Sequence, residues 1–329
     1  MKAIRITEFG GPDRLQLLDA ERPAPGPGEA LVRLTCAGVN FIDVYMRNGS
    51  YARSATYKTP LPMTIGMEGA GTVVELGAGL TGPPVGTRVG YCLARGSYAE
   101  YAAVPAWRLA RIPDGIADPV ATALMLQGCT AHYLSHSAFP LGPEHSCLVH
   151  AGAGGVGQML IQLAKRRGAR VIATAGSADK AEIARARGAD EVVLYRERDF
   201  REAVMGFTAG RGVDVVYDAV GKDTIARSIR SVRRRGLCVN YGGASGLVQS
   251  IEPLELGEAG SIFFTRPHLA DYTASAEEIA WRTGELFDAC AKGELAVVID
   301  RVYPLEEAAA AHTRLEARGT RGKLVLAVT

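Results

Sequence analysis

The sequence predicts an α/β fold, with a doubly wound parallel sheet beside a second, β-rich region. Three observations predict it: strand and helix patterns alternate from about residue 120, a glycine-rich turn joins an apolar strand to a helix, and short strands between Pro/Gly turns precede residue 120. Alternating strands and helices are typical of a parallel sheet with right-handed crossovers. At 329 residues, 47% of them hydrophobic, the chain is long enough for about two domains.

Six strand patterns follow one another after residue 140, enough for a complete dinucleotide-binding sheet. We place the strands at Ser146–His150, Arg170–Ala175, Glu191–Tyr195, Val213–Ala219, Gly236–Tyr241 and Ser261–Thr265. We place the helices between them at Gly155–Arg167, Ala178–Gly188, Phe200–Gly206 and Thr224–Arg235. A last apolar strand, Lys323–Val328, needs a sheet to join, and we expect it to return to the β-rich first region.

Composition excludes several classes of function. A net charge of +2, with Lys and Arg scattered among acids, does not indicate a nucleic-acid partner. No run approaches the ~20 apolar residues of a membrane span, and no apolar run follows the first charges as in a signal peptide. The six cysteines are dispersed, which argues against a disulfide framework and a structural zinc site. We therefore expect a cytoplasmic protein without a membrane partner.

The glycine-rich turn is the strongest chemical signal. Gly152, Gly154 and Gly157 form a G-x-G-x-x-G motif directly after an apolar strand and at the start of a helix. The glycines permit a tight turn and close approach of a pyrophosphate, and the helix N-terminus offers free N–H groups. The alternative is a merely glycine-rich turn, but the strands that follow favour a dinucleotide.

The end of the second strand favours NADPH over NADH. A site for NADH usually has an acidic residue there to bind the ribose hydroxyls, whereas this strand runs into Gly176 and Ser177. Gly176 leaves room for a 2′-phosphate and Lys180 can neutralise it. The alternatives are a solvated surface lysine for Lys180 and a helix N-cap for Ser177.

Several segments resemble a known family. Gly38–Tyr45, Gly66–Gly71 and His150–Gly157 resemble the zeta-crystallin-type quinone oxidoreductases. Tyr217–Gly221, Thr265–Pro267 and Leu315–Arg318 are similar to the bacterial NADPH:quinone reductases in particular. The resemblance follows the whole chain in order and places it in the medium-chain dehydrogenase/reductase superfamily.

The resemblance implies a GroES-like catalytic domain made of both chain ends and a Rossmann domain that binds NADPH. The implied domains are residues 1–122 with 267–329, and residues 123–266. It also implies a homodimer formed through the cofactor domain, with Ser261–Thr265 as the edge strand. Ala219 departs from the pattern, because relatives carry a hydroxyl there that can bind the cofactor.

The candidate site residues come from these motifs and from the resemblance. The residues expected to bind the cofactor are Phe41, Ile42, Asp43, Thr130, Gly154, Gly155, Val156, Gly176, Ser177, Lys180, Tyr195, Tyr241, Gly242, Phe264, Thr265, Arg266 and Arg318. Asn40 and Tyr45 are the candidate catalytic residues, as a hydrogen-bond donor to the substrate and as a proton donor or stacking partner. The alternatives are a loop-stabilising amide and an aromatic ring that packs on the cofactor.

No metal is expected. Zinc alcohol dehydrogenases of the superfamily carry Cys where this chain has Asn40, and His where it has Met67. Asn is a poor zinc ligand, a Met thioether suits softer metals, and catalytic zinc needs three protein ligands. Cys129 alone cannot hold the metal, and Glu68 fits a structural role as well as a catalytic one.

Without a Lewis acid the site suits acceptors that are already electron-poor. The expected activity is an NADPH-dependent quinone reductase that transfers hydride to a quinone. The alternatives are a reductase of enones or alkenals and a non-catalytic, crystallin-like NADPH-binding protein.

Overall fold

The computed structural model describes residues 1–328 and divides the chain into two compact units. Unit 1 comprises Met1–Cys129 and the chain from Tyr272 onward, and unit 2 comprises Thr130–Asp271. The domain limits expected after residues 122 and 266 lie a few residues before these divisions and stay predictions. Within residues 1–328, no helix combines the length and apolarity needed to cross a bilayer.

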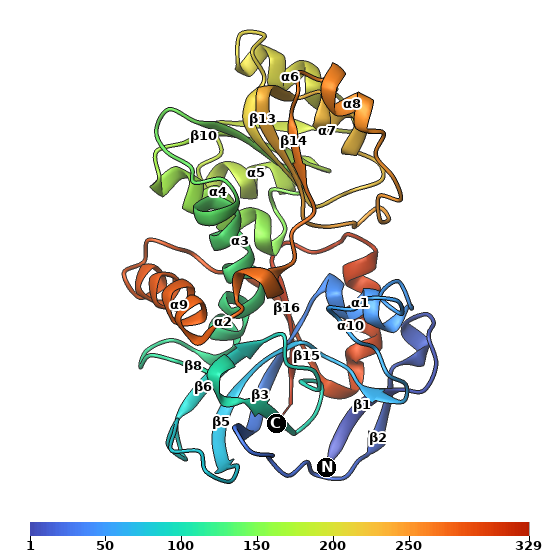
Figure 1. Cartoon of the computed structure of the whole chain (residues 1–329), viewed down its shortest axis with the longest axis vertical. Helices are drawn as coiled ribbons and strands as arrows, with labels where there is room; N and C mark the ends of the chain where they lie inside the picture. Colours follow the sequence, from blue (N-terminus) through green and yellow to red (C-terminus); the bar gives the residue numbers. More distant parts are fainter. Residues whose placement is uncertain (329) are drawn as a thin grey trace. The chain divides into compact units, whose positions relative to one another are not determined.

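Unit 2 contains a six-stranded parallel sheet with the strand order β11-β10-β9-β12-β13-β14 (Figure 1). This is the doubly wound order, so the predicted fold class is confirmed. Its strands are β9 (Ser146–Val149), β10 (Arg170–Ala175), β11 (Glu191–Leu194), β12 (Val213–Asp218), β13 (Val232–Asn240) and β14 (Phe263–Thr265).

Helices cover both faces of this sheet, which explains why its central strands are continuous apolar runs. In Figure 1, α4 and α5 lie on one side of the sheet and α7 and α8 on the other. One core cluster packs Leu148, Ile172 and Val216 of the strands against Phe200 and Ile229. The helices are α4 (Gly155–Arg166), α5 (Ala178–Ala186), α6 (Phe200–Phe207), α7 (Ile225–Ile229) and α8 (Pro253–Glu258).

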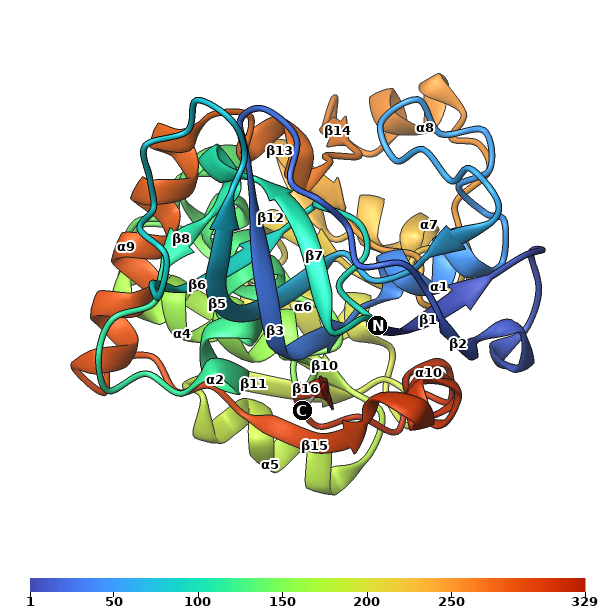
Figure 2. The same ribbon diagram turned by 90° about the horizontal axis from the view of Figure 1, so that it is seen from below.

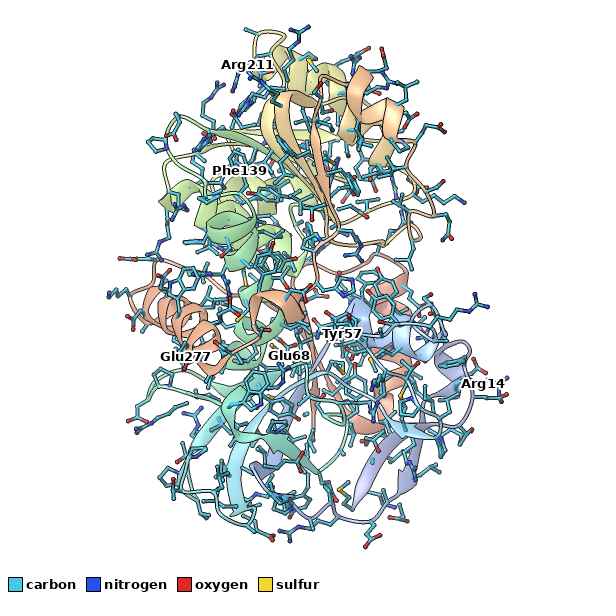
Figure 3. The ribbon with its side chains drawn as sticks, in the orientation of Figure 1. Arg14, Tyr57, Glu68, Phe139, Arg211 and Glu277 are labelled. Atoms are coloured by element: carbon cyan, nitrogen blue, oxygen red, sulfur yellow. The ribbon has the colours of Figure 1, made fainter. Side chains whose placement is uncertain are left out.

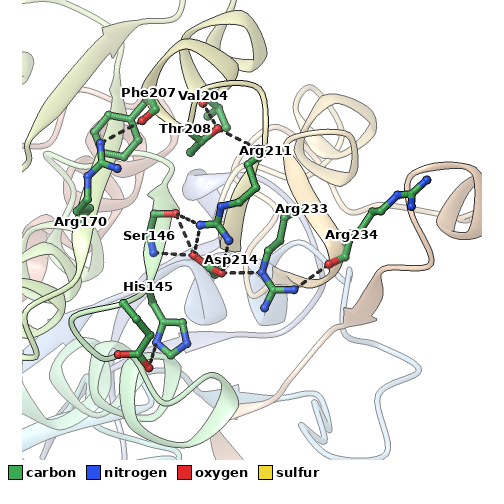
Figure 4. Close-up of polar contacts among 12 residues, drawn as sticks. His145, Ser146, Arg170, Val204, Phe207, Thr208, Arg211, Asp214, Arg233 and Arg234 are labelled. Carbon is green, nitrogen blue, oxygen red and sulfur yellow. Dashed lines mark hydrogen bonds and ion pairs between the residues drawn. The ribbon is translucent and has the colours of Figure 1, made fainter.

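One helix prediction was wrong at its end. We expected a helix over Thr224–Arg235, but α7 ends at Ile229 and the three arginines Arg233–Arg235 lie in β13. The reason is a buried acid: Asp214, at the start of β12, accepts hydrogen bonds from Arg233 Nε (2.6 Å) and from Arg211 Nη2 (2.8 Å) (Figure 4). The Ser146 backbone N–H also donates to Asp214 (2.8 Å), so this carboxylate joins two strands and a loop.

Unit 1 contains two sheets, and Figure 2 shows β3, β5 and β7 of the larger one together. β3 (Glu29–Val39) is its central strand, because it pairs with β5, β7 and β16. The other strands of that sheet are β5 (Glu68–Leu76), β6 (Arg88–Cys92), β7 (Tyr101–Pro105), β8 (Ala110–Arg111), β15 (Ile299–Pro304) and β16 (Lys323–Ala327). The smaller sheet has β1 (Lys2–Ile6), β2 (Gln16–Asp19) and β4 (Met63–Thr64).

The predicted return of the C-terminal strand to the first region is confirmed. β16 pairs antiparallel with β3, with Leu324 opposite Val39 and Ala327 opposite Cys36.

The helices of unit 1 include α1 (Phe41–Arg47), α2 (Asp118–Ala123), α9 (Ala276–Ala291) and α10 (Ala308–Glu316). The chain from Asp118 to Ala138 is a helical run in which α2 and α3 (Cys129–Tyr133) alternate with π-turns at Leu124–Gly128 and Leu134–Ala138.

Replacing Asp214 by Asn tests its role in unit 2. Hydrogen bonds from Arg211, Arg233 and Ser146 outweigh the effect of burial and lower the pKa of Asp214. A carboxyl whose pKa is lower in the folded state stabilises above its unfolded pKa, and this stabilisation is lost as pH falls. We expect Asp214→Asn to lower the free energy of unfolding by about 2–4 kcal/mol at pH 7, and by less near pH 3.

The measurement is urea unfolding at both pH values, with Asp114→Asn at an exposed position as the matched control. An Asp214 variant as stable as the control at pH 7 would contradict this assignment.

Candidate functional site

The predicted cofactor residues of unit 2 follow the carboxyl ends of the parallel strands. Such residues share one edge of a sheet, where ligands bind in doubly wound folds. The sets are Gly154, Gly155 and Val156 after β9; Gly176, Ser177 and Lys180 after β10; Tyr195 after β11; Tyr241 and Gly242 after β13; and Phe264, Thr265 and Arg266 at the end of β14. Thr130, in contrast, lies in α3 and is only 7% exposed.

The glycine turn closes tightly onto the helix that follows it. Gly154 is the N-cap of α4, and its backbone N–H donates to the Ala151 carbonyl (2.9 Å). A Cβ on Gly157 would collide with that same carbonyl oxygen, so only glycine allows this approach of helix to turn. The first N–H groups of α4 have no partner within the helix and form the kind of site that binds a pyrophosphate.

The end of β10 has the features expected of a 2′-phosphate site. The Tyr195 hydroxyl oxygen lies 3.0 Å from the point where a Cβ on Gly176 would stand, so Tyr195 and Gly176 are neighbours. Lys180 lies in the first turn of α5, half-buried. Ser177 stands at the N-cap of α5, but its hydroxyl donates to the Asp179 carboxylate and makes no capping hydrogen bond.

A buried polar cluster holds three strand ends of unit 2 together. Asp218, at the end of β12, accepts from the N–H groups of Val220 (2.8 Å) and Gly221 (2.9 Å) and from the Ser228 hydroxyl (2.7 Å). Since Ser228 donates to Asp218, it accepts from His150 Nε2, and His150 Nδ1 then accepts from the Thr174 hydroxyl. Burial lowers the pKa of His150, which keeps this ring neutral.

Unit 1 contains a second buried cluster, formed around Asn40 at the N-terminus of α1. Asn40 Nδ2 donates to Glu68 Oε2 (2.9 Å), and Asn40 Oδ1 accepts from Lys323 Nζ (2.7 Å). Lys323 also forms a short ion pair with Glu68, and both side chains are fully buried. Glu68, on β5, is labelled in Figure 3. Both edges of the Asn40 amide are therefore engaged within the protein.

An ordered chain of hydrogen bonds runs from Arg47 to Asp43 beneath α1. Arg47 Nη1 can only donate, so His312 Nδ1 accepts (3.0 Å) and His312 Nε2 carries the proton. His312 Nε2 is 3.1 Å from the Tyr98 hydroxyl, which is 3.2 Å from Asp43 Oδ2. The Asn40 backbone N–H also donates to Asp43 Oδ2 (2.9 Å). Asp43 is 0% exposed, so from this position it supports α1 and does not line a surface.

Aromatic rings continue from α1 into the following loop. Ring centroids lie 6.0 Å apart for Phe41 and Tyr45, 5.2 Å for Tyr45 and Tyr51, and 5.4 Å for Tyr51 and Tyr57. The last pair is stacked, with 15° between the ring planes. We call these four residues the aromatic row.

Sequence reasoning missed Lys323, Tyr98, His312 and the polar cluster around Asp218. One signal was available for Lys323, because a lysine that opens an apolar strand is unusual. Its partners, however, are 283 and 255 residues away along the chain. Arg318, expected near the cofactor, is exposed and follows α10 in a left-handed conformation (φ 55°).

Asp43 and His312 predict opposite effects of pH on stability. Burial raises the pKa of Asp43 to about 7 and lowers the pKa of His312 to about 3. Between about pH 4 and 7 the folded state keeps a proton on Asp43 that the unfolded chain releases, so stability falls as pH rises. Below about pH 6.5 the unfolded chain protonates His312 and the folded state does not, so stability falls as pH falls.

We expect Asp43→Asn to leave the His312 effect unopposed. The free energy of unfolding of the variant minus that of wild type should increase from pH 4.5 to pH 6.5, by up to about 1.4 kcal/mol per pH unit. His312→Gln should show the opposite trend, and the measurement is urea unfolding across that range. Identical pH dependences in all three proteins would contradict the assignment.

Comparisons with known proteins extend this picture. Residues 26–114 match the alcohol dehydrogenase GroES-like domain and residues 155–280 match the zinc-binding dehydrogenase family. The chain is 41% identical to the 2-haloacrylate reductase of a Burkholderia species, over 98% of this chain and 97% of the relative. It is 39% identical to the quinone oxidoreductase of Pseudomonas aeruginosa, over 99% of each chain. The Escherichia coli quinone oxidoreductase complexed with NADPH matches with a TM-score of 0.96 and 37% identity, over 100% of each chain.

The zinc implied by one family description does not fit the residues present. Asn40 and Glu68 already bind the Lys323 ammonium, which would repel a divalent cation placed between them. Burial raises the pKa of Cys129 to about 12, which opposes the thiolate that zinc requires. The residues at Asn40, Glu68 and Cys129 therefore do not provide the ligands of a catalytic zinc. The chain belongs to the quinone oxidoreductase family of the medium-chain dehydrogenase/reductase superfamily.

Proposed function

We propose that the protein is an NADPH-dependent quinone reductase that works without zinc. The observation that carries this proposal is the Asn40–Glu68–Lys323 cluster, in which an ammonium neutralises the carboxylate and occupies both Asn40 and Glu68, so that these two side chains are not available to a Lewis acid. Full-length relatives named quinone oxidoreductases support the same conclusion.

NADPH fits the residues of unit 2. The glycine turn and the N-terminus of α4 would bind the pyrophosphate. Gly176, Lys180 and Tyr195 would surround the 2′-phosphate, and no acidic residue stands at the end of β10 to prefer NADH. We propose Ser177, Tyr241, Gly242, Phe264, Thr265 and Arg266, at the same edge of the sheet, as further cofactor contacts.

Bound NADPH supplies a hydride, and the product also needs one proton. A quinone that accepts hydride becomes a hydroquinone anion, which is stable enough to take that proton from water or from a side chain. No metal is needed to stabilise this anion, in contrast to the alkoxide of an alcohol substrate. The task of the protein is to orient two planar partners and exclude water.

In unit 1 we propose that Phe41, Ile42 and Tyr45 line the nicotinamide end, with Phe41 and Tyr51, the partly exposed rings of the aromatic row, as the stacking surface for a planar acceptor. The ring contacts of Tyr45 with Phe41 and Tyr51 support a stacking role for Tyr45. The internal hydrogen bonds of Asn40 support a positioning role over donation to a substrate.

Reduction of an activated alkene is the second candidate. The relative with 41% identity is a 2-haloacrylate reductase, whose name indicates a conjugated substrate. Enones and quinones both accept hydride without a Lewis acid, so the same residues would serve either substrate.

We also propose a cytoplasmic homodimer formed through unit 2. β14 is the edge strand of its sheet, and Phe263 on β14 is 66% exposed. Leu254 on α8 is 69% exposed, which adds apolar surface in the same unit. Six free cysteines fit a reducing compartment.

The test is the initial rate of NADPH and NADH oxidation with a panel of quinones and enones. Fast oxidation of NADPH by quinones is the expected result. A preference for enones would favour the second candidate, and NADPH binding without oxidation by any acceptor would leave a binding protein.

Replacing Lys180 by Ala tests the cofactor assignment. Loss of a charge-assisted hydrogen bond should raise the KM for NADPH about ten- to a hundredfold. The KM for NADH should stay unchanged, because NADH lacks the 2′-phosphate. Lys292→Ala, at an exposed position of unit 1, is the control. An equal change in both KM values would argue against the assignment.

A further inference from the structure

We propose that the Lys323 ammonium takes the place of a metal cation in unit 1 and positions Asn40, so that α1 presents its first residues to the nicotinamide end of NADPH. This inference rests on the proposed function. It makes Lys323 a positioning residue, because it acts through Asn40 and has no assigned contact with substrate or cofactor.

The Glu68 carboxylate requires a nearby positive charge because it is buried. Glu68 is 0% exposed and Lys323 is 0% exposed, so neither can be neutralised by water. A buried carboxylate needs a cation or hydrogen-bond donors near it. The cation within hydrogen-bond distance of Glu68 among the described residues is Lys323. The remaining Glu68 oxygen accepts a hydrogen bond from the Leu126 backbone N–H, so both oxygens of the carboxylate have a donor.

The backbone beside this ion pair leaves room for both side chains. Gly38 lies beside it on β3, and a Cβ at Gly38 would overlap Glu68 Oε2 and lie 2.8 Å from Lys323 Cε. Any larger residue would displace one member of the pair. Lys323 is the first residue of β16, and its backbone N–H donates to the Val298 carbonyl (2.8 Å). This hydrogen bond fixes the backbone from which the Lys323 side chain extends to Glu68.

The ion pair also fixes the orientation of the Asn40 side chain. The amide oxygen of Asn40 is held by Lys323 (2.7 Å) and its nitrogen by Glu68 (2.9 Å). The backbone N–H of Asn40 is held by Asp43 (2.9 Å), one turn into the helix. Asn40 is therefore fixed at the side chain and at the backbone, and Phe41 and Ile42 follow directly. Loss of the ammonium would free one edge of the amide and leave Glu68 unneutralised.

The experiment compares two ligands of the whole protein: NADPH and 2′,5′-ADP, which has the adenosine 2′-phosphate but no nicotinamide. Lys323→Met keeps an unbranched side chain, one heavy atom shorter, and removes its charge. We expect Lys323→Met to bind NADPH at least about tenfold more weakly, with the affinity for 2′,5′-ADP within about twofold of wild type. Lys292→Met, at an exposed lysine of the same unit, should leave both affinities unchanged.

A double-mutant cycle separates the ion pair from a general loss of folding. Glu68→Gln combined with Lys323→Met removes both charges, and we expect the double variant to bind NADPH more tightly than Lys323→Met alone. If Lys323→Met does not fold, the double variant takes its place, with the same prediction of weakened NADPH and unchanged 2′,5′-ADP binding.

Two results would overturn the inference: unchanged NADPH affinity in a folded Lys323 variant, or an equal loss for both ligands. Wild-type protein that binds neither ligand would instead refute the proposed NADPH site, and the role of Lys323 would fall with it.

Discussion

The buried carboxylate of Glu68 imposes the constraint on which the rest of unit 1 depends. A charge removed from water must be balanced within hydrogen-bond distance, and this chain balances it with the ammonium of Lys323. The balance draws together three distant segments, because Asn40 follows β3, Glu68 opens β5 and Lys323 opens β16. The pairing of β16 with β3 places the Lys323 ammonium within reach of Glu68.

Unit 2 also relies on buried carboxylates, in this case to fix the ends of its parallel strands. Its strand ends must be rigid enough to hold a dinucleotide and open enough to admit one. Glycines in the turn allow α4 to approach the turn closely. The buried hydrogen bonds from His150 to Ser228 and from Ser228 to Asp218 connect the ends of β9 and β12. Asp214 has the corresponding structural role at the start of β12, where Arg233 balances it. Each unit therefore contains buried carboxylates whose partners decide which neighbouring elements stay fixed.

Local patterns in the sequence were enough for the fold class and for the position of the glycine turn. The apolar runs of β9 and β10 and the glycine turn between β9 and α4 follow from short-range rules, so their positions could be predicted closely. The predicted helix over Arg233–Arg235 failed because a buried acid, Asp214, draws basic side chains into a strand, and no local rule contains that partner. The same limit hid Lys323, His312 and Tyr98. Their roles depend on contacts between residues more than 200 positions apart, which a single sequence does not reveal.

The central claim is that an ammonium has replaced a metal in this site. Its most direct test is the zinc content of active protein produced in zinc-supplemented medium, measured by mass spectrometry together with the rate of NADPH oxidation by a quinone with and without a chelator. We expect far less than one zinc per chain and a rate that the chelator leaves unchanged. One zinc per chain, with activity lost to the chelator and restored by zinc, would contradict the account.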